Sequence, residues 1–116
     1  TNVMKISDCE LALYSKHKRV AFFEYQYYGN VENYSIDWSN SKRIHPTQKP
    51  IKLYDWLLQN YAKKNYKILD THLGSGSIAI ACHYFGCDLV GIEIDKEYFD
   101  KAKNRFNDLT RQESLF

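Results

Sequence analysis

Apolar positions in the second half of the chain alternate between helical and strand-like patterns. In the first helical segment, Tyr54, Leu57, Leu58 and Tyr61 recur at the i, i+3, i+4, i+7 spacing of one helix face. The full order is helix, strand, helix, strand, helix, with predicted ranges of about 51–64, 66–70, 77–85, 88–94 and 96–109. Gly86 ends the middle helix as a C-cap. A strand–helix–strand crossover implies parallel strands, so this half of the chain predicts an α/β fold.

The first half has a strand-like pattern that is rich in aromatic residues. Residues 9–14 and 20–28 favour strands and are separated by the basic stretch 16–19, which predicts an antiparallel pair at one edge of the fold. Phe23, Tyr25 and Tyr27 share one face of the second strand. Such a face can pack as half-buried strand surface or stack nucleic-acid bases, and packing is the commoner cause. Residues 29–43 show no period and predict a loop.

Composition limits the class of protein. The chain has 116 residues, 44% hydrophobic and 26% charged, which fits one globular domain or a piece of a larger one and excludes a disordered chain. No stretch approaches the ~18 apolar residues of a membrane span, so we expect a soluble, cytoplasmic protein. The net charge of +2 comes entirely from the first 50 residues, a weak indication of a nucleic-acid partner. The pattern already reads as a strand by Asp8, which suggests a missing front.

The three cysteines give no sign of a disulfide framework or a metal site. Cys9, Cys82 and Cys87 are odd in number and lack the Cys-x-x-Cys spacing of a zinc knuckle. We therefore expect reduced, buried thiols.

A glycine-rich turn joins the first strand of the second half to the middle helix. Its sequence is Asp70-Thr71-His72-Leu73-Gly74-Ser75-Gly76-Ser77. The two glycines allow a tight turn and close approach of a ligand to the main chain, and the helix that follows presents unpaired N–H groups. Asp70, before the glycines, can interact with an ammonium group. The turn therefore predicts a site for a polar ligand, and a side chain at Gly76 is expected to fill the space of that ligand.

A carboxylate follows at the end of the next strand. Glu93 lies roughly 20 residues after Asp70, the position from which an acidic side chain binds ribose hydroxyls. Residues 74–79 also satisfy the Gly-x-Gly-x-x-Ala pattern of dinucleotide-binding domains, so the nucleoside could belong to NAD. Only one helix and a tail follow Glu93, which leaves little room for a second nucleotide.

Both prolines of the chain lie in one short segment, His45-Pro46-Thr47-Gln48-Lys49-Pro50. Each proline fixes its own φ and pushes the residue before it toward extended geometry, so the segment is stiff before any ligand binds. Pro50 also suits the first position of a helix. A stiff segment that presents a hydroxyl, an amide and an ammonium group suits a carboxylate ligand, and it can equally be a rigid helix lead-in.

The order of these motifs, 45–50, then 70–77, then 91–95, resembles the C-terminal half of DNA amino-methyltransferases that modify adenine N6 or cytosine N4. The resemblance is to the permuted class, in which the cofactor motifs come last, and phage and prophage adenine methylases are similar. It is most specific over residues 43–105, and residues 7–12 are similar to the preceding strand of such enzymes. It implies a Rossmann-like, S-adenosylmethionine-dependent methyltransferase fold of the α/β class, incomplete because the N-terminal catalytic portion is missing.

By this resemblance the cofactor is S-adenosylmethionine (SAM). Residues 47–49 would flank its amino-acid end, residues 70–76 would wrap it and Glu93 would bind the ribose. His72 stands where the family often has Phe. The implied cofactor-binding residues are Thr47, Gln48, Lys49, Asp70, His72, Gly74, Ser75, Gly76, Ser77 and Glu93; no metal ligand and no catalytic residue is expected in this chain.

The resemblance also implies a catalytic Asp/Asn-Pro-Pro-Tyr/Phe motif that holds the flipped target base, and the chain has no Pro-Pro pair. In the permuted class this motif lies upstream. We therefore expect the cofactor-binding half of a DNA methyltransferase of phage or restriction-modification type, inactive alone. Residues 1–40 would contribute a strand pair and an aromatic-rich loop from the catalytic side, and residues 41–116 the SAM-binding region.

The expected partners are double-stranded DNA, the missing catalytic segment in cis or in trans, and a second copy of the chain in a homodimer. Two alternatives stay open at this point: a non-catalytic SAM-binding or partner subunit, and an NAD-binding Rossmann fragment.

Overall fold

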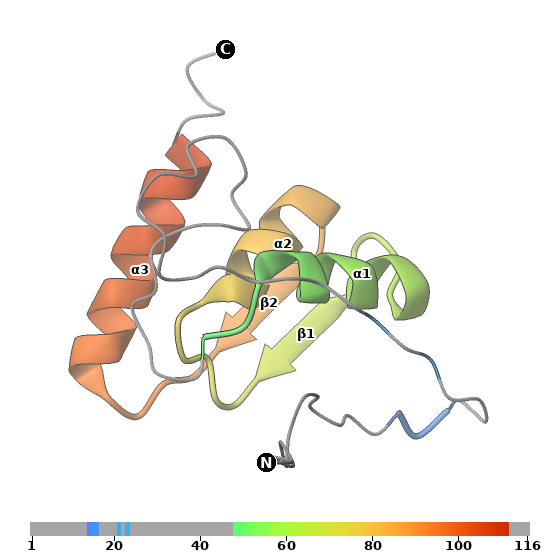
Figure 1. Cartoon of the computed structure of the whole chain (residues 1–116), viewed down its shortest axis with the longest axis horizontal. Helices are drawn as coiled ribbons and strands as arrows, with labels where there is room; N and C mark the ends of the chain where they lie inside the picture. Colours follow the sequence, from blue (N-terminus) through green and yellow to red (C-terminus); the bar gives the residue numbers. More distant parts are fainter. Residues whose placement is uncertain (1–13, 17–20, 22, 24–47, 112–116) are drawn as a thin grey trace, which may run out of the picture.

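The computed structural model describes residues 14–16, 21, 23 and 48–111. Its elements follow in the order α1 (Ile51–Tyr61), β1 (Lys67–Asp70), α2 (Ser77–Phe85), β2 (Asp88–Gly91) and α3 (Lys96–Arg111) (Figure 1). The predicted alternation of helices and strands is therefore confirmed. The expected strand pair at residues 9–14 and 20–28, and the loop at 29–43, lie largely outside the described residues.

Strands β1 and β2 pair in parallel, as the crossover through α2 predicts. Lys67 is opposite Asp88 and Asp70 is opposite Gly91, so the strands start and end together. Their carboxyl ends therefore meet at one edge, where the turn into α2 and the turn into α3 also lie (Figure 1). Ligands of open α/β sheets bind at this edge.

Three of the predicted elements were too long and one was too short. Helix α1 ends at Tyr61, three residues early, because Ala62 adopts an extended conformation. Strand β1 begins at Lys67, one residue late, and β2 ends at Gly91, three residues early, because the chain then turns toward α3. Helix α3 continues to Arg111, two residues beyond its predicted end.

The core lies between α1, α2 and one face of the strand pair. Ile51 and Leu58 of α1 are buried with Ile80, Ala81 and Cys82 of α2, and the side chains of Ile68 and Leu89 pack on this cluster from the strands. Gly86 adopts the left-handed conformation at the end of α2, as predicted for its C-cap, and its N–H bonds the carbonyl of Cys82. The opposite face of the strands stays open: the side chains of Leu69 and Val90 are 63% and 64% exposed.

Two aromatic residues of the first half contact α1. The ring of Tyr14 lies 4.7 Å from that of Tyr61, and the ring of Phe23 lies 5.4 Å from that of Trp56. Phe23 thus packs against α1. In the part of the chain that the structure describes, no helix is long and apolar enough to cross a membrane.

Candidate functional site

The turn between β1 and α2 stays hydrogen-bonded to the chain that leaves β2. Beyond the paired strands, the Ile92 N–H bonds the carbonyl of Asp70 at 2.8 Å, and the Leu73 N–H bonds the carbonyl of Ile92 at 2.9 Å. Asp70 Oδ1 accepts a bond from the His72 N–H at 2.9 Å. The turn is therefore held in place on the strand side before the two glycines begin.

Glu93 connects this turn to the start of α3. Its Oε1 accepts a hydrogen bond from the Gly74 N–H and its Oε2 accepts one from the Asp95 N–H, both at 3.0 Å. The side chain is half-buried. An ionised carboxylate can accept several hydrogen bonds at once, so a single side chain can hold both N–H groups. The sequence placed Glu93 near the turn, and the structure brings the two into direct contact.

The proline-containing segment also reaches the turn. Ser77 Oγ donates to the backbone carbonyl of Lys49 at 2.7 Å, which joins residues that are far apart in the chain. Gln48 is 5% exposed and Lys49 is half-buried. Thr47, the remaining predicted residue of this segment, lies outside the described residues.

The serines of the turn face inward. Ser75 and Ser77 are buried, and their hydroxyl oxygens lie 3.2 Å apart. Nη1 of Arg105, on α3, donates to the Ser75 carbonyl at 3.0 Å and to Ser77 Oγ at 2.9 Å. Because these side chains already have partners inside the protein, what the two serines can offer a ligand is their main chain.

The remaining predicted residues lie at the surface or against α3. His72 is exposed, with its Nδ1 2.8 Å from the hydroxyl of Thr71. Gly76 has φ +78°, and a Cβ there would lie 3.2 Å from Cβ of Ala102. A side chain at Gly76 would therefore press against α3, and its expected effect on a bound ligand stays a prediction.

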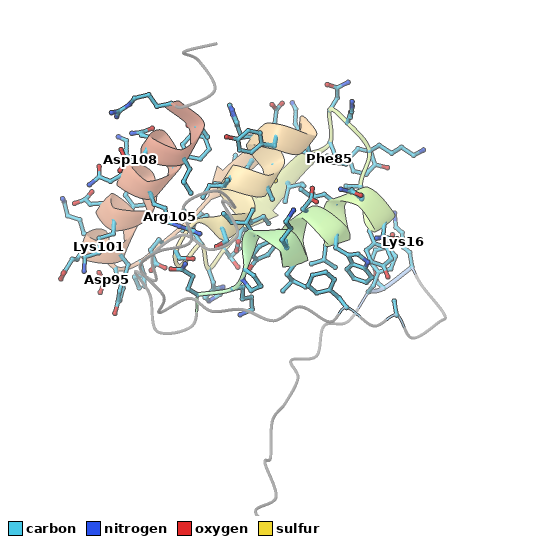
Figure 2. The ribbon with its side chains drawn as sticks, turned by 45° about the horizontal axis from the view of Figure 1, so that its top comes forward. Lys16, Phe85, Asp95, Lys101, Arg105 and Asp108 are labelled. Atoms are coloured by element: carbon cyan, nitrogen blue, oxygen red, sulfur yellow. The ribbon has the colours of Figure 1, made fainter. Side chains whose placement is uncertain are left out.

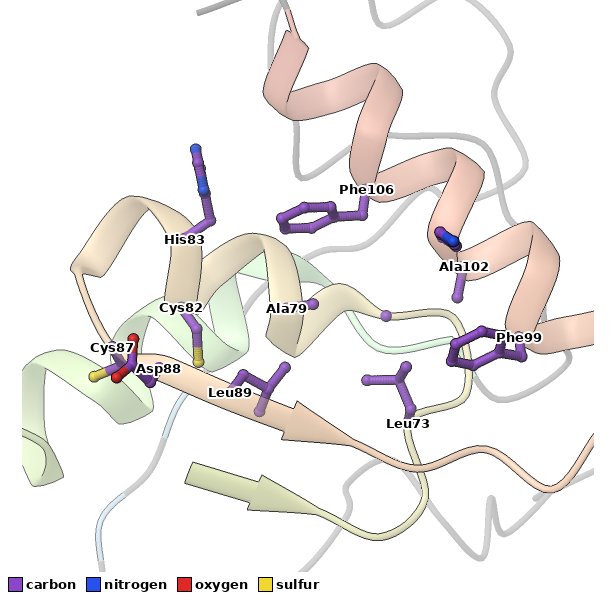
Figure 3. A pocket seen from close by; sticks show the side chains of 12 residues that line it. Leu73, Ala79, Cys82, His83, Cys87, Asp88, Leu89, Phe99, Ala102 and Phe106 are labelled. Atoms are coloured by element: carbon purple, nitrogen blue, oxygen red, sulfur yellow. The ribbon is translucent and has the colours of Figure 1, made fainter. Parts of the chain in front are cut away.

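A hollow of about 410 Å³ lies between α2 and α3, away from the carboxylates of the strand ends. Figure 3 shows Phe99 beside Leu73 at one end of the hollow and Cys82 above Leu89 at the other. Burial raises the pKa of the Cys82 thiol to about 11, with smaller contributions from Cys87 and Asp70. Both described cysteines are unbridged; Cys82 is buried as predicted, whereas Cys87 is only half-buried. The hollow is mostly apolar and contains neither Asp70 nor Glu93.

Sequence reasoning missed Arg105. Ala102, Phe106 and Leu109 mark the apolar stripe of α3, and Arg105 falls on the same stripe because it lies three residues after Ala102. A charged residue at a core position of an otherwise regular helix was the available signal. The role of this arginine depends on the glycine-rich turn that faces it, and the pattern of the helix alone does not show which segment lies there.

Comparison with known proteins agrees with these features. A family model described as "DNA methylase", N6_N4_Mtase, matches residues 11–104. The type II methyltransferase M.HpaI of Haemophilus parainfluenzae is 33% identical over 69 residues, which cover 60% of this chain and 22% of that protein. The type II methyltransferase M2.LlaDCHI of Lactococcus lactis subsp. cremoris is 34% identical over 79 residues, covering 68% and 28%.

Solved structures give the same result. The M1.HpyAVI–SAM complex is 39% identical, with a TM-score of 0.54, over 57% of this chain and 32% of that one. A putative DNA modification methylase of Thermus thermophilus is 26% identical, with a TM-score of 0.51, over 60% and 29%. The fold is thus that of an α/β methyltransferase. The chain spans less than a third of the length of each of these relatives.

Proposed function

Because the chain belongs to the N6_N4_Mtase family of DNA methylases, we propose that it is the SAM-binding part of an enzyme that methylates an exocyclic amine of adenine or cytosine in DNA. The finer reading follows the motif order: the C-terminal half of a permuted-class methyltransferase of phage or restriction-modification type. Residues 41–116 would bind the cofactor, and residues 1–40 would belong to the catalytic and target side.

The observation that carries this proposal is the position of Glu93. Its carboxylate lies where the parallel strands end and contacts the glycine-rich turn through Gly74 at 3.0 Å. A carboxylate at the end of the second strand is the usual partner of ribose hydroxyls. Glu93 would therefore hold the turn and the ribose at the same time.

The other groups at this edge fit the rest of the cofactor. SAM carries an ammonium group and a carboxylate at its amino-acid end. Asp70 Oδ1 is occupied by the His72 N–H, while its second oxygen has no partner among the described residues and can accept from an ammonium group. Lys49, whose backbone carbonyl accepts a hydrogen bond from Ser77 Oγ, would provide a cation near the carboxylate. Gly74, Ser75, Gly76 and Ser77 would contribute main-chain contacts, with Thr47, Gln48 and His72 as neighbouring contacts.

When bound, SAM supplies a methyl group on a sulfonium, which an amine can attack directly. The residues of this chain would bind and orient the cofactor, and such alignment supplies much of the rate in a reaction that needs no further covalent step. The acceptor groups that hold the target amine, and the aromatic surface for the flipped base, would come from the Asp/Asn-Pro-Pro-Tyr/Phe motif that this sequence lacks.

The open face of the strand pair supports this reading of a partial enzyme. Parallel sheets are normally covered on both faces, but here Leu69, Val90 and Ile92 are 51–64% exposed on the strands and just beyond them. An apolar face of this kind suits further helices and strands of the same enzyme, supplied in cis or in trans. The longer relatives have such a remainder, since the matches cover 22–32% of their length. Homodimerisation through this face is the competing outcome.

Calorimetric titration of the chain with SAM and with NAD tests the cofactor. We expect SAM to bind and NAD to bind more weakly, because the solved relative that this chain resembles was crystallised with SAM. Tighter binding of NAD would contradict the proposal and favour the dinucleotide alternative.

Methyl transfer to mixed-sequence duplex DNA tests the partial-enzyme reading. We expect background transfer by the chain alone, and transfer above background when an upstream segment that carries the Pro-Pro motif is added in cis or in trans. Turnover by residues 1–116 alone would contradict this reading. Persistent inactivity of the joined protein, with SAM still bound, would favour a non-catalytic SAM-binding subunit.

A further inference from the structure

Arg105 is a buried cation on α3 that contacts the glycine-rich turn. It is 7% exposed, and Figure 2 shows it on the side of α3 that faces α2, whereas Lys101 and Asp108 point outward. Burying a guanidinium is costly, and an apolar side chain of similar size would usually stabilise a fold as well or better. Stability alone therefore gives little reason for an arginine at this position.

Two hydrogen bonds of Arg105 reach the glycine-rich turn. One nitrogen, Nη1, donates both to the Ser75 carbonyl and to Ser77 Oγ. Ser77 Oγ in turn donates to the Lys49 carbonyl at 2.7 Å. A single guanidinium thus fixes the turn directly and the proline-containing segment through one hydroxyl.

Helix α3 contributes a second contact to the same place. Ala102, one turn before Arg105, lies against Gly76, where even a Cβ would approach it to 3.2 Å. The small residue lets α3 approach the turn, and the arginine then reaches the carbonyl of Ser75. The turn is therefore held between Glu93 on the strand side and Arg105 on the helix side.

We propose that Arg105 is a positioning residue that keeps the glycine-rich turn and the Lys49 segment in the geometry that binds the cofactor. This inference rests on the proposed SAM site. Arg105 would act on the cofactor site through the protein, because it donates to the Ser75 carbonyl and to Ser77 Oγ. Its effect would pass through the Ser75 peptide and Ser77.

The test compares Arg105→Met and Arg105→Lys with two controls in the 116-residue chain. Lys103→Met removes a positive charge from an exposed position on the same helix. Leu58→Ala weakens the core at α1, away from the turn. Urea unfolding gives the stability of each variant, calorimetry gives its affinity for SAM, and the amide resonances of Gly74 and Gly76 in ¹H–¹⁵N spectra report the turn without any cofactor.

We expect Arg105→Met to weaken SAM binding about five- to tenfold and to shift both glycine resonances. Arg105→Lys should recover part of the affinity, because it keeps the charge but not the reach of the guanidinium. Both controls should bind SAM within about twofold of the wild type. Leu58→Ala should do so even though its unfolding midpoint falls.

Two results separate this inference from the proposed function. If the wild-type chain binds SAM and Arg105→Met binds it equally well, or loses no more affinity than Leu58→Ala, Arg105 is only structural and the inference is wrong. If the wild-type chain does not bind SAM, the proposed function itself fails. A Ser77→Ala change adds a check: combined with Arg105→Met it should weaken binding by less than the product of the single effects, because both act through one network.

Discussion

Replacing Glu93 with alanine should reduce both stability and cofactor affinity. The change removes two hydrogen bonds to a charged acceptor, from Gly74 and from Asp95. Such bonds contribute roughly 1.5–3 kcal/mol each when buried. Glu93 is half-exposed, so water can solvate the freed N–H groups, and we expect a total loss of about 1.5–3 kcal/mol in the free energy of unfolding.

The matched control is Glu97→Ala. Glu97 lies on the first turn of α3 and forms an exposed ion pair with Lys101 at 3.2 Å. Exposed pairs of this type contribute about 0.2–1 kcal/mol, so this change should cost clearly less than the change at Glu93. Glu93→Gln should fall between Glu93→Ala and the wild type, because it keeps one acceptor oxygen.

Urea unfolding followed by circular dichroism, and calorimetry with SAM, measure the two effects. A loss of binding free energy of about 1.4 kcal/mol corresponds to a tenfold weaker affinity, and we expect at least that for Glu93→Ala. If Glu93→Ala has the same free energy of unfolding and the same SAM affinity as Glu97→Ala, the bridge between Gly74 and Asp95 has no energetic importance and the assignment of the ribose site is wrong.

Three further changes test other contacts. The folded state raises the pKa of Cys82 to about 11, against an ordinary value of 9.0. The neutral thiol therefore contributes its full stability below pH 9, and this contribution is lost as the pH rises toward 11. Unfolding curves that keep the same difference between wild type and Cys82→Ala across this pH range would contradict the prediction. Gly91→Ala would place a Cβ 2.7 Å from Leu73 Cδ1. Thermal unfolding should show that the change lowers the free energy of unfolding by about 1–3 kcal/mol and that Leu73→Ala in the same chain relieves part of this loss. If the effects of the two changes simply add, the predicted contact is wrong. Val90→Thr, on the open face of the sheet, should change the stability of the chain by less than about 0.5 kcal/mol but weaken its association with the upstream segment in a pull-down, and unchanged association would rule out docking at that face.

The order of the elements could be predicted because their signals are local. Helical spacing in α1, the continuous apolar run of α2 and the glycine at its end each depend on residues close together in the chain. The ends of the strands could not be predicted in the same way. β2 ends at Gly91, where the chain turns toward α3. The sequence did not show this end, because residues 92–94 keep the apolar–polar alternation of a strand.

The candidate site was predictable in its members but not in its internal bonds. Asp70, the glycine-rich turn and Glu93 follow from the rule that ligands bind at the carboxyl ends of parallel strands. The inward direction of Ser75 and Ser77 was not predictable, because it depends on Arg105, which lies 30 and 28 residues further along the chain. Long-range hydrogen bonds of this kind leave little trace in periodicity.

The contacts of the Ser77 hydroxyl limit where the chain can be divided in a rearranged or split gene. It contacts both the Lys49 carbonyl and Arg105, so a break in the coding sequence anywhere between these two positions would separate partners that meet at one atom. A break before Lys49 or after Arg105 would leave all three on one polypeptide. Recombination and split-gene engineering should therefore tolerate new ends outside residues 49–105 far better than within them, and this interval is the smallest cassette that could be moved between methyltransferase genes with the turn intact.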